Sequence, residues 1–114
     1  MSTKIKNISI LGSTGSIGTQ SLEVINSHPD QLRLVAMAAG GAHKELMLEQ
    51  AIKYQPSLIA VDDVQAAQWL RDQLREHYAS AHSAQKPKMT VLDGKKVKEQ
   101  FGVDLETEVK MIGE

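Results

Sequence analysis

Three glycines and three hydroxyl residues in the segment 12–18 are the residues best suited to bind a ligand. The segment reads Gly-Ser-Thr-Gly-Ser-Ile-Gly and lies between a strand-like apolar run and a segment of helical period. A glycine turn at such a junction lets the main chain approach a pyrophosphate closely, while the N–H groups and the positive dipole end of the helix face the negative charge. We therefore predict an anion site here, at which the hydroxyls of Ser13, Thr14 and Ser16 add donors.

Two other interpretations of this glycine turn are less favoured. A P-loop needs a lysine followed by serine or threonine after its last glycine, whereas Gly18 is followed by Thr19 and Gln20, so the nucleoside-triphosphatase class is excluded. A plain tight turn is the second alternative, but it does not need three glycines at intervals of three residues. The spacing G-x-x-G-x-x-G also differs from the usual G-x-G-x-x-G of dinucleotide-binding proteins.

The end of the second expected strand indicates which dinucleotide would bind. Folds that select NAD generally place an Asp or Glu roughly 20 residues beyond the glycine motif to hold the ribose 2′-hydroxyl. Segment 37–44 reads Met-Ala-Ala-Gly-Gly-Ala-His-Lys and has no carboxylate, which favours NADP over NAD. His43 or Lys44 could meet the 2′-phosphate; the alternative is that both are exposed residues in the first turn of the next helix.

Other polar residues are assigned to structural or surface positions. Asp62 and Asp63 can be a general acid and base, but the N-terminal cap of a helix is the simpler explanation. His28, His77 and His82 have no carboxylate or second histidine at ligand spacing. We therefore predict no catalytic residue and no metal ligand in this chain.

Composition excludes several classes of protein. The 114 residues include no cysteine, and 13 Lys+Arg against 14 Asp+Glu give a net charge of −1. There is thus no disulfide framework, thiolate metal site or cysteine nucleophile. Nucleic-acid binding is not expected, because the lysines between 86 and 98 lack interleaved aromatic residues. The longest apolar run, 34–39, is too short to cross a membrane, and the first residues do not resemble a targeting peptide.

Apolar segments rich in β-branched residues alternate with segments of helical period, which is typical of βαβ folds. We predict strands at 5–11, 32–39, 58–61 and 89–92, helices at 16–27, 43–55 and from Asp62 or Asp63 to Tyr78, a loop at 79–88, a further helix to Phe101, and no completed strand after Val103. The inner face of the first helix is expected to be Ile17, Ser21, Val24 and Ile25. The chain is thus expected to be one α/β domain, 1–114, of the Rossmann type. Its doubly wound, mostly parallel sheet would have the strand order 3-2-1-4 and would bind the cofactor across the carboxyl ends of strands one and two.

These segments resemble the N-terminal part of the 1-deoxy-D-xylulose 5-phosphate reductoisomerase family. The resemblance covers residues 5–76 and rests on the run 8–18, Leu22-Glu23-Val24-Ile25, His28-Pro29, the segment 34–40 and Tyr54-Gln55-Pro56. It implies an enzyme that converts 1-deoxy-D-xylulose 5-phosphate to 2-C-methyl-D-erythritol 4-phosphate in non-mevalonate isoprenoid biosynthesis. The family does so by skeletal rearrangement and hydride transfer from NADPH, with Mg²⁺ or Mn²⁺ bound.

The resemblance also implies which residues bind NADPH. The pyrophosphate contacts are expected at Thr14, Gly15, Ser16 and Ile17, and the adenosine-end contacts begin at Gly40 and include Gly41. Gly12 and Ser13 are also assigned to the cofactor site. After Gly40 the family usually carries a basic or small polar residue and an Asn, where this chain has Gly41 and Ala42. This departure puts the usual side-chain contacts to the 2′-phosphate in doubt, although the backbone N–H of Gly41 remains available.

The family's metal-binding Asp and Glu residues and its substrate-phosphate site lie downstream of the matched residues. The chain is therefore expected to be an N-terminal fragment that is inactive alone. The full-length protein would be a homodimer with a sugar-phosphate substrate, in the bacterial cytoplasm or, after removal of a leader, in a plastid-type organelle. The alternatives are a nucleotide-binding or assembly module without catalysis, and the cofactor domain of another NADP-dependent reductase.

Overall fold

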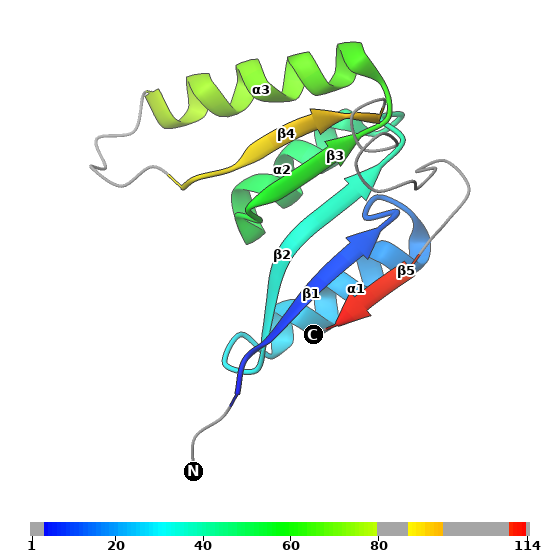
Figure 1. Ribbon diagram of the computed structural model, residues 1–114, viewed down its shortest axis with the longest axis vertical. Helices are drawn as coiled ribbons and strands as arrows, with labels where there is room; N and C mark the ends of the chain where they lie inside the picture. The colour runs from blue at the N-terminus through cyan, green and yellow to red at the C-terminus, as the bar shows by residue number, and fades with distance from the viewer. Residues whose placement is uncertain (1–3, 80–86, 95–109, 114) are drawn as a thin grey trace.

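A computed structural model describes residues 4–79, 87–94 and 110–113, the last of these as backbone only. The elements in chain order are β1 (Lys6–Leu11), α1 (Ser16–Ser27), β2 (Leu32–Ala39), α2 (Lys44–Tyr54), β3 (Leu58–Val61), α3 (Val64–Ala79), β4 (Thr90–Asp93) and β5 (Lys110–Gly113). The strands form one sheet in the order β4-β3-β2-β1-β5 (Figure 1). The first four strands are parallel, and β5 is antiparallel to β1.

The predicted α/β fold with a Rossmann-type, mostly parallel sheet is confirmed. Each of the elements from β1 to β4 begins and ends within one or two residues of the predicted bounds. The helix predicted to reach Phe101 and residues 80–86 of the predicted loop lie outside the described residues. Among the helices that are described, none is both long and apolar enough to cross a membrane.

The predicted strand order 3-2-1-4 is wrong. The neighbour of β4 is β3, with Leu58 opposite Thr90 and Val61 opposite Asp93. The other edge of β1 is occupied by β5, so the expectation of no strand after Val103 is wrong as well. The predicted order 3-2-1-4 and the observed order 4-3-2-1 can both be built with right-handed crossovers, so the handedness rule allows either. The periodic pattern along the chain locates the elements and does not distinguish the two orders either. The choice depends on contacts between elements.

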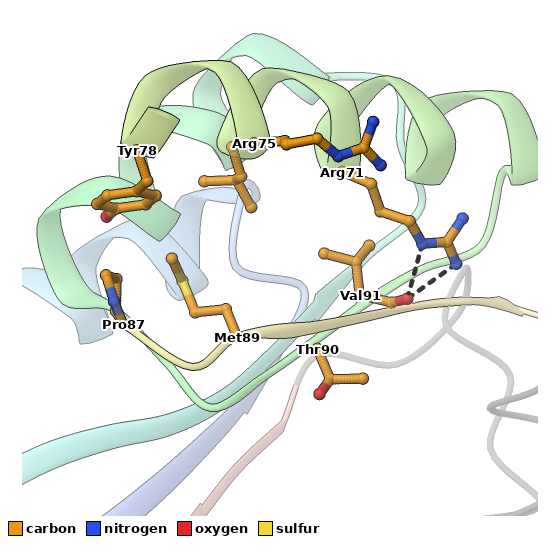
Figure 2. Close-up of a pocket in the computed structure, with 8 residues that line it drawn as sticks. Arg71, Arg75, Tyr78, Pro87, Met89, Thr90 and Val91 are labelled. Carbon is orange, nitrogen blue, oxygen red and sulfur yellow. Dashed lines mark hydrogen bonds between the residues drawn. The ribbon is translucent and has the colours of Figure 1, made fainter. Parts of the chain in front are cut away.

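Contacts between α3 and β4 keep β4 beside β3. Val91 is buried in the same apolar cluster as Leu70 and Leu74 of α3. The Nε and Nη2 atoms of Arg71 both donate to the Val91 carbonyl oxygen, at 3.1 and 2.8 Å (Figure 2). Because β4 is at the edge of the described sheet, this carbonyl has no partner among the described strands on that side. Arg71 therefore satisfies an acceptor that the edge would otherwise leave open.

All three described helices pack on one face of the sheet. Their buried side chains and those of the strands form one cluster, which includes Ile10, Leu22, Met37, Met47, Ile59, Val61, Leu70 and Val91. Successive right-handed crossovers that add strands in one direction place their helices on the same face. On the other face, Ala38 and Ala60 form a smaller cluster with Leu11 and Leu92. The second helical layer of a doubly wound fold is not among the described residues.

The strand order can be tested by cross-linking, because the chain contains no native cysteine. We expect the double variant Leu58→Cys, Thr90→Cys to form a disulfide on mild oxidation. Paired strands lie about 4.8 Å apart, within the ~4.4–6.8 Å Cα separation that a disulfide spans. The control Ser9→Cys, Thr90→Cys joins β1 to β4, which are three strand spacings or about 14 Å apart, and should stay reduced. Thiol titration and intact mass measure the result, and rapid cross-linking of the control pair would support the order 3-2-1-4 instead.

Candidate functional site

The three glycines of the turn between β1 and α1 have different geometric roles. Gly12 has φ +83°, in the left-handed region that favours glycine. A Cβ at Gly18 would collide with the Gly12 carbonyl oxygen and lie 2.9 Å from the Ser13 Cα. Gly15 has φ −79° and ψ 172°, which any residue can adopt, and a Cβ there would meet the Gly12 oxygen at an ordinary 3.4 Å. The fold thus requires glycine at 12 and 18, whereas glycine at 15 leaves room for another molecule.

Backbone donors at the start of α1 are free to meet that molecule. Gly15 is the N-cap residue, no side chain caps this end, and the first turn has no acidic residue. The first N–H groups of a helix have no acceptor within it. Thr19 N–H donates to the Gly15 carbonyl at 2.9 Å, so the helical bonds begin there. Gly15 N–H donates to the Gly12 carbonyl at 3.0 Å, so the donors that suit an anion are the N–H groups of the first helical turn, which starts at the exposed Ser16.

The start of α3, at the same edge of the sheet, differs from that of α1. Asp63 Oδ1 accepts from the N–H groups of Gln65 and Ala66, at 2.8 and 3.5 Å. The predicted capping role is therefore confirmed for Asp63. An anionic side chain already occupies the start of α3, whereas the start of α1 has none.

Ser13 does not lie at the mouth of the site, contrary to the prediction for its hydroxyl. It is fully buried, and its Oγ has no hydrogen-bond partner among the described residues. Its carbonyl oxygen accepts from Gln50 Nε2 of α2 at 2.8 Å, and Gln50 is itself 5% exposed. Nothing in the turn's sequence indicated Gln50, because the contact joins residues 37 positions apart. Ser13 therefore anchors the turn to α2.

The inner face of α1 differs from the predicted one. Its buried residues are Gly18, Leu22 and Ile25, whereas Ile17 is 66% and Val24 51% exposed. The close approach of Gly18 to the turn sets the rotation of α1 about its axis. The helix face that contains Gly18, Leu22 and Ile25 therefore packs on the sheet. Ile17 is consequently on the solvent side, next to the free donors.

Main-chain hydrogen bonds connect the glycine turn to the end of β2, and the residue after β3 to the end of β2. The N–H groups of Gly12 and Ser13 both donate to the Ala38 carbonyl oxygen, at 2.7 and 3.0 Å, and Asp62 N–H donates to Ala39 at 3.1 Å. The structure thus brings Gly40, at the end of β2, to the same sheet edge as the glycine turn. A Cβ at Gly40 would have nothing within 4 Å, so its surroundings are open.

Away from the glycine turn, the described residues form no metal centre, and one hollow lies between α3 and β4. In the described parts of the chain, no three His, Asp or Glu side chains come together in a way that could hold a metal ion. A hollow of about 470 Å³ lies between α3 and the start of β4 and is lined by Arg71, Tyr78 and Met89, among others (Figure 2). None of its lining residues belongs to the glycine turn or to the ends of β1 and β2.

Alanine substitutions should separate the roles of Gly18 and Gly15. We expect Gly18→Ala to lower the free energy of unfolding by about 3 kcal/mol or more, because the methyl group overpacks the contact with Gly12. This loss should exceed the ~1 kcal/mol that alanine gains in helix propensity. The control Gly15→Ala should change the stability by less than about 0.5 kcal/mol. Urea unfolding followed by circular dichroism measures both, and equal losses would contradict the assignment.

Replacement of Gln50 should weaken the anchor between α2 and the turn. Gln50→Leu keeps the side chain's bulk but leaves the buried Ser13 carbonyl without its donor, at an expected cost of about 1–3 kcal/mol in unfolding free energy. Gln68→Leu is the matched control, since Gln68 Nε2 also donates a hydrogen bond, but on an exposed helix face. Urea unfolding should show a change below about 0.5 kcal/mol for the control. A Gln50 variant as stable as the control would show that the anchor contributes nothing.

Comparison with known proteins identifies relatives of the chain by sequence. The family model of 1-deoxy-D-xylulose 5-phosphate reductoisomerase matches residues 8–106. The chain is 53% identical over 70 residues to the reductoisomerase of Desulforamulus reducens, covering 61% of this chain and 18% of that protein. It is 44% identical over 85 residues to the reductoisomerase of Synechococcus sp. (strain CC9902), covering 75% of this chain and 20% of that protein. The chain thus spans about a fifth of the length of these curated relatives.

Solved structures agree at the level of the fold. A crystal structure of DOX-P reductoisomerase in complex with magnesium matches 89% of this chain and 23% of that chain, with a TM-score of 0.70 and 22% identity. A second, with fosmidomycin and magnesium, has a TM-score of 0.66 at the same identity, over 86% of this chain and 22% of that chain. Because the family model covers most of the sequence, the chain belongs to the 1-deoxy-D-xylulose 5-phosphate reductoisomerase family.

Proposed function

We propose that this chain is the NADPH-binding part of a reductoisomerase that converts 1-deoxy-D-xylulose 5-phosphate to 2-C-methyl-D-erythritol 4-phosphate in non-mevalonate isoprenoid biosynthesis. Membership of the family supports the reaction. The geometry of Gly15 carries the assignment to cofactor binding, because the fold does not require a glycine at this exposed position. Close approach of a pyrophosphate to the main chain does require it.

The residues of this chain would bind and orient the cofactor. Thr14, Gly15, Ser16 and Ile17 would contact the pyrophosphate at the uncapped start of α1, and Gly40 and Gly41 would contact the adenosine end. Of the other two predicted residues, Gly12 would act through the shape of the turn, and Ser13 through its main chain. When bound, NADPH supplies the hydride for the reduction.

Metal and substrate binding would depend on parts of the full-length protein outside the described residues. The related crystal structures are described as complexes with magnesium, and one also with fosmidomycin. The described residues do not fit such an ion, since they group no three possible ligands. For the full-length protein, we propose a site for Mg²⁺ or Mn²⁺, a sugar-phosphate substrate, a homodimeric state and a location in the bacterial cytoplasm.

The test of cofactor binding is a valine at position 15. We expect Gly15→Val to fold like the parent and to lose NADPH binding, because the isopropyl group would occupy the space over the free N–H groups. Ser57→Val is the matched control, an exposed small residue replaced at the opposite, amino-terminal end of β3. Calorimetric titration with NADPH and circular dichroism measure affinity and fold. Unchanged affinity in a folded Gly15 variant would refute the proposed function.

A further inference from the structure

A second hollow lies beyond the glycine turn, at the carboxyl ends of β2 and β3. Its volume is about 300 Å³, near the lower end for sites that hold a small organic ligand. One wall is formed by Gly41, which follows β2, and by Lys44 and Glu45 in the first turn of α2. The start of α3 forms the other wall with Asp63 and Gln65. A dinucleotide whose pyrophosphate lies on the start of α1 and which crosses the end of β2 would bring its adenosine end to this hollow.

The residues that directly follow β2 have no cationic side chain that could reach into the hollow. Gly41 has φ +103°, and a Cβ there would lie 3.0 Å from the Asp63 Cβ and 3.1 Å from the Val61 Cγ1. Any side chain at 41 would therefore be strained and blocked. Ala42 has no polar side-chain atom. His43 is exposed and is not among the residues that line the hollow.

Lys44 is the single cationic residue among the described residues that line this hollow. Its Nζ lies over the ring of Trp69 in α3, 4.9 Å from the ring centroid. Trp69 is partly buried and packs against the apolar core, so its position is fixed. A cation over an indole face is held by the negative charge of that face. This contact joins the first turn of α2 to α3, since Lys44 belongs to α2 and Trp69 to α3.

The negative charges at the hollow are those of Glu45 and Asp63. Asp63 Oδ1 already accepts from the N–H of Gln65. Glu45 is exposed, so solvent and salt screen its charge. The start of α2 adds backbone donors, since its N-cap residue His43 makes no side-chain capping bond.

We propose that Lys44, positioned by Trp69, recognises the 2′-phosphate of NADPH and is the residue that selects NADPH over NADH in this chain. This inference rests on the proposed function, and it assigns the phosphate contact to a position three residues beyond Gly41. Lys44 is the binding residue, and Trp69 is a positioning residue that acts through it.

The experiment uses two small probes that fill only the adenosine end, adenosine 2′,5′-bisphosphate and 5′-AMP, besides NADPH. We expect the parent chain to bind the bisphosphate more tightly than 5′-AMP. Lys44→Met should weaken binding of the bisphosphate about tenfold or more, the effect of losing a hydrogen bond to a charged group, and leave 5′-AMP unchanged. Lys44→Arg should keep the parent's preference for the bisphosphate over 5′-AMP, because arginine retains the positive charge. Trp69→Leu should reduce the preference for the bisphosphate partly. Urea unfolding checks that the Trp69 variant remains folded.

Lys53→Met is the matched control, because Lys53 Nζ also lies over an aromatic ring, that of Tyr54, at the far end of the same helix. It should alter neither affinity. If the parent prefers the bisphosphate and Lys44→Met keeps that preference, the role of Lys44 is refuted while dinucleotide binding stands. If the parent binds none of the three ligands, the proposed function fails and the role of Lys44 fails with it.

Discussion

The close approach of α1 to the main chain of Gly12 is the contact on which the candidate site depends. At Gly18 the helix is as near to the turn as two backbones allow, since a single methyl group would collide with the Gly12 carbonyl. This contact fixes the rotation of α1 and directs its first N–H groups away from the sheet. The glycine turn is itself held to the end of β2, because the N–H groups of Gly12 and Ser13 both donate to the Ala38 carbonyl oxygen. Backbone contacts therefore place the donors of the site, and the Gln50 side chain anchors the same turn to α2.

Helix α2 links the two ends of the site. Gln50, in its middle, donates to the Ser13 carbonyl of the glycine turn, and Lys44, in its first turn, lies over Trp69 beside the second hollow. A helix is stiff over this length, so a displacement of one contact would displace the other. In the proposed function, the distance between the pyrophosphate donors and the adenosine end would thus be set by one helix, which packs on the core through Met47 and Ala51.

Local pattern was sufficient to predict the elements from β1 to β4 and the glycine turn, but not β5 or the placement of elements in space. The bounds of β1, α1 and β2 depend on runs of neighbouring residues and on breaks such as Gly12 and Pro29. The position of β4 depends instead on the contact of Arg71 with Val91, and the burial of Ser13 depends on a glutamine in another helix. Such contacts join residues 20 and 37 positions apart and leave no periodic signal in the sequence.

The different starts of α1 and α3 explain why we propose the pyrophosphate site at α1 and not at α3. A capping side chain such as Asp63 typically adds about 1 kcal/mol to the stability of a helix, and α1 lacks that contribution. A carboxylate at the start of α1 would occupy the same N–H groups that a pyrophosphate needs and would repel it. The absence of a cap on α1 is therefore a loss of stability that a bound anion can offset. Asp63 gives α3 its stability but closes its N-terminus to a second phosphate, which leaves Lys44 as the nearby cation.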